Sequence, residues 1–202
     1  MVSNMAIPPC LTRCDEHGLT EYYEAILAAT SKPLIVQDAS GYVGHSISIQ
    51  TQGNLFRRYP DRIMFKPEAI PIGPKLSALR EATNGQAKIF EGTGGLALID
   101  SYQRGVTGTM PGTDVCWALV AIWRSLESGD HERARRIHEP LAVMVSMQTS
   151  LDAFLAIEKM LLVEQGVFKN AIVRRPVGYR LDEETRLEVL RLFDRLRRAV
   201  DH

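Results

Sequence analysis

The chain has 202 residues, of which 45% are hydrophobic and 24% are charged, a composition typical of a globular protein. The formal net charge is zero, which argues against a nucleic-acid partner or an anionic membrane surface. No apolar stretch is long enough and free enough of charge to span a membrane, and the N-terminus lacks the features of a signal peptide. Three cysteines do not make a disulfide framework, so we expect a cytoplasmic protein.

Five short apolar runs are predicted to be β-strands that are covered on both faces. They comprise residues 4–7, 33–37, 62–66, 87–90 and 105–109. Stretches with helical periodicity lie between them, at residues 18–30, 75–83 and 95–103. Alternating strands and helices predict parallel βαβ units and an α/β fold. No Gly-x-Gly-x-x-Gly follows the first run, which weakens a dinucleotide-binding interpretation, and a (β/α)₈ barrel is the other common arrangement.

The remainder of the chain is predicted to be helical. Helical patterns cover residues 114–126, 130–147, 151–165 and 182–200, and glycine- or proline-containing turns separate them. The last predicted helix begins with acidic residues and ends with arginines. Acidic side chains near the N-terminus and basic side chains near the C-terminus interact favourably with the helix dipole. A βα repeat in residues 1–112 is therefore expected to precede a helical region in residues 113–202.

The order of these segments resembles that of the family of dihydrodipicolinate synthase and N-acetylneuraminate lyase. The resemblance runs from about the fourth barrel strand of the family to its C-terminus. Asn4-Met-Ala-Ile-Pro-Pro9 is similar to the fourth strand and its exit, and Pro33-Leu-Ile-Val-Gln37 to the fifth. Ile63-Met-Phe-Lys66 resembles the sixth strand, where the family keeps its imine-forming lysine. Phe90-Glu-Gly92 and Gly105-Val-Thr-Gly-Thr109 resemble the seventh and eighth strands.

The resemblance implies a class I lyase, either an aldolase or a dehydratase, that binds a 2-oxo acid as a Schiff base on Lys66. It implies a partial (β/α)₈ TIM barrel, with strands four to eight in residues 1–112. Residues 113–202 would then hold the last barrel helix and the helical C-terminal region. Class I chemistry needs neither a metal nor a cofactor, and the family commonly forms homo-oligomers.

Two departures from the family pattern bear on the activity. Gln37 stands where the family usually has a tyrosine that relays protons, and an amide cannot titrate. This glutamine and the sequence Lys66-Pro67-Glu68 are similar to relatives that dehydrate 2-keto-3-deoxy sugar acids, so that branch is favoured. Counterparts of strands one to three, which hold the substrate carboxylate in the family, are not found among the predicted strands.

The residues around Lys66 suit imine chemistry. A strand end beside Met64 and Phe65 disfavours the charged amine, and the neutral amine can attack a ketone to form an electron-withdrawing iminium ion. Glu68 lies two residues further on the same side of an extended strand and is predicted to act as a general acid or base, or to hold a neighbouring hydrogen-bond network. Each residue also has a plainer interpretation: Lys66 as a surface lysine, and Glu68 as a solvated loop carboxylate.

Other predicted contacts come from the ends of the neighbouring strands. Gln37 is expected to hydrogen-bond the substrate or a water molecule, and Gly92 and Thr109 are expected to line the pocket. Backbone N–H groups of residues 91–95 can hold an anionic or hydroxyl-rich group, although an ordinary βα turn has the same sequence. The five histidines show no metal-ligand spacing, and no metal site is predicted.

Two alternatives to the enzyme remain open from the sequence. One is a truncated, non-catalytic remnant of such a lyase, because only five of eight barrel strands are recognised. The other is an open α/β sheet of another class, such as a small-molecule-binding domain. The lysine at a strand end and the long helical region weaken the second alternative.

Overall fold

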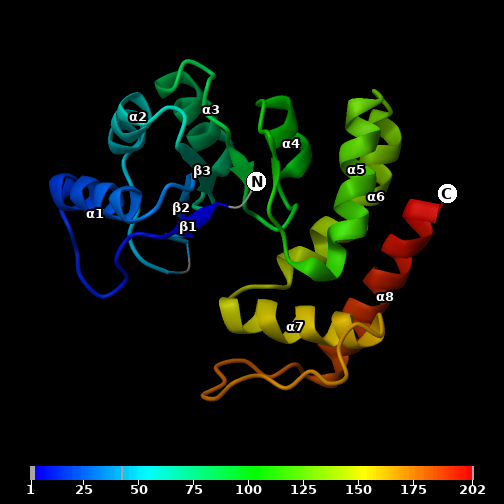
Figure 1. Ribbon diagram of the computed structural model, residues 1–202. Coiled ribbons are helices and arrows are strands. Elements are labelled where there is room, and N and C mark those ends of the chain that lie inside the picture. Colours follow the sequence, from blue (N-terminus) through cyan, green and yellow to red (C-terminus); the bar gives the residue numbers. More distant parts are fainter. Residues whose placement is uncertain (1–2, 42, 202) are drawn as a thin grey trace. The chain divides into compact units, whose positions relative to one another are not determined.

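A computed structural model describes residues 3–41 and 43–201 (Figure 1). All of the strand pairs in these residues are parallel. The strands are β1 (Asn4–Ala6), β2 (Leu34–Asp38), β3 (Ile63–Pro67), β4 (Phe90–Glu91) and β5 (Gly108–Thr109). β2 lies between β1 and β3, and β4 pairs with β5. A parallel bridge between Phe65 and Ile89 connects β3 to the residue before β4. Spatial order therefore follows chain order, and the predicted α/β fold is confirmed.

Helices alternate with the strands up to β5, and the described residues after β5 form helices without further strands. The first four are α1 (Glu16–Ala29), α2 (Ile49–Arg58), α3 (Ile72–Ala82) and α4 (Leu98–Gln103). A 3₁₀ turn, Thr113–Val115, leads into α5 (Cys116–Glu127), α6 (His131–Ser146), α7 (Leu151–Glu164) and α8 (Glu183–Asp201). No helix in the described part of the chain is long and apolar enough to cross a membrane. The chain forms two compact units, Met1–Gly92 with Asp100–Met110, and Thr93–Ile99 with Pro111–His202.

Helix α2 was not among the predicted helices. Its buried face includes Thr51, Gln52 and Gly53 as well as two apolar residues, so the apolar periodicity is weak. Gly53 lies against α3, since a Cβ there would stand 3.3 Å from the Cβ of Ala82. The side chain of Ser48 caps the helix by accepting a hydrogen bond from the amide of Thr51. Tertiary packing and the cap stabilise a helix that apolar spacing does not indicate.

The expectation that all strands are covered on both faces is wrong for β1. Every residue of β2 and β3 is buried, whereas Asn4 and Met5 of β1 are exposed. Within the described residues, β1 pairs only with β2 and forms the edge of the three-stranded sheet. As an edge strand, β1 leaves one row of backbone N–H and C=O groups without a neighbouring strand among the described residues.

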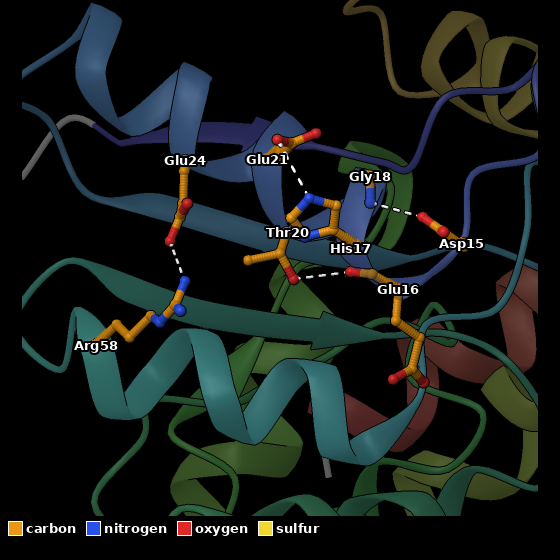
Figure 2. A network of polar contacts seen from close by, with 8 residues as sticks. All are labelled: Asp15, Glu16, His17, Gly18, Thr20, Glu21, Glu24 and Arg58. Carbon is orange, nitrogen blue, oxygen red and sulfur yellow. Dashed lines mark hydrogen bonds and ion pairs between the residues drawn. The ribbon is translucent and has the colours of Figure 1, made fainter.

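Helix α1 shows how local polar contacts fix an element beside the sheet (Figure 2). Asp15 caps its N-terminus by accepting a hydrogen bond of 2.8 Å from the amide of Gly18. Further along, Glu24 pairs with Arg58 at the end of α2 at 2.5 Å, which ties the two helices together. The buried residues of α1 are Leu19, Tyr23 and Leu27, spaced four apart.

The second unit is a helical bundle in which α6 packs against both α5 and α8. Trp117 of α5 meets Phe193 of α8 edge-on, with ring centroids 5.8 Å apart. Arg133 of α6 donates a hydrogen bond to the backbone carbonyl of Val200 near the end of α8. The four helices predicted after residue 113 are all present, with ends that differ by one or two residues.

Candidate active site

Lys66 lies near the end of β3 with its amine enclosed by protein. Its side chain is only 11% exposed, and its Nζ lies 2.5 Å from Oε1 of Glu68. The preceding residue, Phe65, packs towards α2, where its ring centroid is 6.4 Å from that of Phe56. Because successive strand residues point to opposite faces, Lys66 points away from α2. The interpretation of Lys66 as a surface lysine does not fit this burial.

Glu68 receives two donors on the same oxygen. Besides Lys66, the side-chain amide of Gln37 donates to Oε1 of Glu68 at 2.9 Å. Gln37 is the register partner of Lys66 across β2 and β3, so both side chains point to the same face of the sheet. The carboxylate is 5% exposed rather than solvated, and a buried charge of this kind is stabilised only by close partners.

Gly92 follows β4 and packs directly against Glu68. A Cβ at position 92 would overlap Cγ of Glu68 and stand 2.9 Å from its Oε1. The absent side chain therefore makes room for the carboxylate that Lys66 contacts. The structure thus brings four of the five predicted site residues together: Lys66, Glu68, Gln37 and Gly92.

Thr109 lies in a neighbouring pair. Its hydroxyl donates a hydrogen bond of 2.6 Å to Oε2 of Glu91, the register partner on β4. Glu91 is fully buried. The hydroxyl predicted to line the pocket is engaged with this carboxylate, one residue before Gly92.

Two buried acids next to the site were not predicted. Asp38 ends β2 directly after Gln37, and Glu91 ends β4 directly before Gly92. Both are at most 2% exposed. An acidic residue that closes an apolar run is the available sequence signal, because ends of parallel strands gather at one edge of the sheet.

The turn after Gly92, predicted as a possible anion-binding loop, is ordered by contacts within the second unit. Gly94 and Gly95 adopt positive φ angles of 69° and 94°, which favour glycine. The Nε2 atom of His138 lies 2.9 Å from the carbonyl oxygen of Gly95 and 3.1 Å from that of Leu96. The contact requires an N–H at Nε2, so the side chain of His138 helps to order this turn.

Metal ligation has no support in the described part of the chain. No group of three or more His, Cys, Asp or Glu residues there is placed to hold a metal ion. His202 lies outside the described residues.

Comparison with known proteins gives the family. The family model for the dihydrodipicolinate synthetase family matches residues 1–195. The chain belongs to this family. No match was found among curated proteins.

Solved structures share the fold of this family member. Dihydrodipicolinate synthase from Rhodopseudomonas palustris superposes with a TM-score of 0.84 at 23% identity, over 96% of this chain and 65% of that one. The 4-hydroxy-tetrahydrodipicolinate synthase of Methylacidiphilum fumariolicum SolV gives 0.85 at 20% identity, over 98% and 65%. A catalytic lysine mutant of Ruminococcus gnavus sialic acid aldolase gives 0.81 at 18% identity, over 98% and 65%. The chain thus spans about 65% of the length of these proteins.

Proposed function

We propose that this protein is a class I lyase that binds a 2-oxo acid as a Schiff base on Lys66. The buried pair of Lys66 and Glu68, joined by Gln37 near the ends of two parallel strands, is the observation that carries the proposal. Membership of a family with synthases and aldolases supports it. The sialic acid aldolase of Ruminococcus gnavus, which shares the fold, likewise has a catalytic lysine.

The architecture proposed with this function is a partial (β/α)₈ barrel. Strands β1 to β5 would correspond to barrel strands four to eight in residues 1–112, and residues 113–202 to the last barrel helix and the C-terminal helical region. Five parallel strands in chain order and the coverage of 65% of the relatives support this assignment. We also propose a homo-oligomer, as is common in the family.

Proton transfer between Lys66 and Glu68 would begin the reaction. Only a neutral amine is a nucleophile, and the carboxylate 2.5 Å away is placed to accept the proton from the ammonium group. The amine then adds to the ketone carbon of the 2-oxo acid to give a carbinolamine. Glu68 returns its proton to the carbinolamine hydroxyl, which leaves as water, and the nitrogen lone pair forms the iminium bond.

Gln37 supports this transfer without taking part in it. Its amide donates to the same oxygen that contacts Lys66, and it has no titratable proton. It therefore orients the carboxylate, and Glu68 takes the acid–base role that a tyrosine has in other family members.

The iminium ion would then withdraw electrons from the substrate. Loss of a C3 proton to a base, followed by protonation of the C4 hydroxyl and its departure as water, gives dehydration. Removal of the C4 hydroxyl proton with cleavage of the C3–C4 bond instead releases an aldehyde in a retro-aldol reaction. Gln37 and the Lys66-Pro67-Glu68 sequence favour dehydration of a 2-keto-3-deoxy sugar acid. Glu68, whose Oε1 lies 2.5 Å from the lysine nitrogen, is placed to act as this base.

Reductive trapping tests the proposal. The protein is incubated with pyruvate or a 2-keto-3-deoxy sugar acid, reduced with borohydride, and its intact mass is measured. One adduct per chain is expected for the wild type and for Lys88→Met, which changes an exposed lysine. Lys66→Arg keeps a cation beside Glu68 and should give none. Absence of an adduct with every 2-oxo acid would favour the non-catalytic alternative.

A further inference from the structure

Asp38 is a buried carboxylate on the opposite side of β2 from Gln37. Its side chain is 3% exposed, and donors reach it from three places among the described residues. The amide of Ser40 lies 3.2 Å from Oδ1, the hydroxyl of Ser46 lies 3.4 Å from Oδ2, and Nζ of Lys75 lies 3.6 Å from Oδ2. A charge taken so far out of water needs such compensation. Asp38 thereby joins both ends of the segment after β2 to the first turn of α3.

Tyr23 of helix α1 interacts electrostatically with this carboxylate. Burial raises the pKa of Tyr23 above its usual range, and the charges of Tyr22 and Asp38 contribute to the same rise. The phenol therefore stays neutral. Its hydroxyl is buried and has no hydrogen-bond partner among the described residues.

The backbone of Asp38 reaches the candidate active site. Its carbonyl oxygen accepts a hydrogen bond of 2.9 Å from the amide of Glu68. Pro67, the register partner of Asp38, has no N–H, so the bond from Glu68 is what continues the pairing of β2 and β3 at this end. The main chain of Glu68 is thus held by Asp38, while its side chain is held by Lys66 and Gln37.

We propose that Asp38, anchored by Lys75, is a positioning residue that keeps Glu68 against Lys66. Side chains alternate along β2, so Gln37 points towards Lys66 and Asp38 points towards α3. Gln37 therefore holds the side chain of Glu68 on one face, while Asp38, fixed by Lys75 on the other face, holds its backbone. Displacement of the Asp38 carboxylate would release the segment after β2 and shift the Glu68 backbone. The inference rests on the proposed Schiff-base function of Lys66.

Variants of the ion pair test this role. Lys75→Met removes the cation, Asp38→Asn removes the charge while retaining an acceptor for Ser40, and Lys75→Arg restores a cation. The rate of borohydride trapping is measured against pyruvate concentration, well below the unfolding temperature of each variant. We expect Lys75→Met and Asp38→Asn to slow trapping at saturating pyruvate by about 10-fold, because small misplacements of catalytic groups have effects of this order or larger. Lys75→Arg should recover most of the rate.

Coupling and a control pair distinguish positioning from general stabilisation. The double variant of Asp38→Asn with Lys75→Met should be no slower than the slower single variant, since both act through one contact. Arg58→Met breaks an ion pair with Glu24 in the same unit and should trap at the wild-type rate. Among these variants, hydrogen exchange of the Glu68 amide should accelerate in Asp38→Asn and Lys75→Met and stay near the wild-type rate in Lys75→Arg and Arg58→Met.

The outcomes separate this inference from the proposed function. If the wild type forms the adduct but the folded variants trap at its rate with unchanged exchange at Glu68, Asp38 has no positioning role. If the wild type forms no adduct, the Schiff-base function fails and this role fails with it. Should the Asp38 variant not fold, Lys75→Met and Ser46→Ala give the decisive rates.

Discussion

Asp114 provides a quantitative test of the electrostatics, because it is a buried acid without full compensation. It lies in the 3₁₀ turn before α5 and is 1% exposed, and its Oδ2 has no hydrogen-bond partner in the described part of the chain. Burial raises the pKa of its carboxyl from 3.8 to about 6, and the nearby charge of Glu158 adds to the rise. The folded state therefore binds this proton more tightly than the unfolded state does.

The change in pKa converts into a cost in stability. Each pH unit between the two pKa values is worth about 1.4 kcal/mol, so ionised Asp114 costs the folded protein on the order of 3 kcal/mol at neutral pH. Asp114→Asn removes this cost while keeping the shape of the side chain. The backbone carbonyl of residue 114, which accepts hydrogen bonds from Trp117 and Gln165, is retained. We expect the variant to be more stable than the wild type by up to about 3 kcal/mol at pH 7.

The pH dependence follows from the direction of the shift. Below the unfolded pKa of 3.8 both states are protonated at Asp114, and the wild type carries no penalty. As the pH rises from there to about 6, the wild type loses stability relative to the variant, and above that range the difference is constant.

Urea unfolding of the wild type and Asp114→Asn between pH 4 and pH 8 measures this difference. Glu158→Gln is the matched variant, because removing the second cause of the shift should reduce the penalty on the remaining Asp114. A stability difference that stays constant over the whole range, or an asparagine variant that is less stable at pH 7, would refute the reasoning.

Further predictions concern the site and two helix ends. Gly92→Ala should displace Glu68 and slow trapping at Lys66 by about 10-fold or more; a wild-type rate would contradict the contact. Arg62→Ala removes a guanidinium that donates to three carbonyl oxygens at the end of α1, so urea unfolding should show a loss of about 1–3 kcal/mol. The Asp182 carboxyl has a lowered pKa because it accepts hydrogen bonds from Thr185. Asp182→Asn should therefore destabilise the protein at neutral pH, and this loss should disappear as the pH falls through the lowered pKa.

The parts of the fold that could be predicted from the sequence are those in which a run of apolar residues forms a fully buried element. Residues 33–37 and 62–66 are apolar throughout and form the two fully buried strands β2 and β3. Lys66 is assigned through the resemblance of Ile63-Met-Phe-Lys66 to the sixth strand of the family, since a lysine at a strand end is by itself most simply a surface residue. Strands β4 and β5 are only two residues long, so the runs at 87–90 and 105–109 overestimated them.

The remaining features depend on contacts between distant residues. Buried Glu91 accepts a hydrogen bond from Thr109, 18 positions later, and buried Asp38 is paired with Lys75 of α3. Neither partner can be identified from spacing along the chain. The sequence alone fits Glu68 as a solvated carboxylate as well as a general acid or base, because the contacts of Gln37 and Gly92 with it arise only in the fold.

Peptide mapping of the borohydride-reduced protein tests the central claim most directly. After reduction with pyruvate, proteolysis and mass spectrometry locate every lysine that carries the reduced adduct. The account predicts a single modified lysine, Lys66. Modification at Lys75 or at exposed lysines with Lys66 unmodified, or no modified lysine at all, would contradict it.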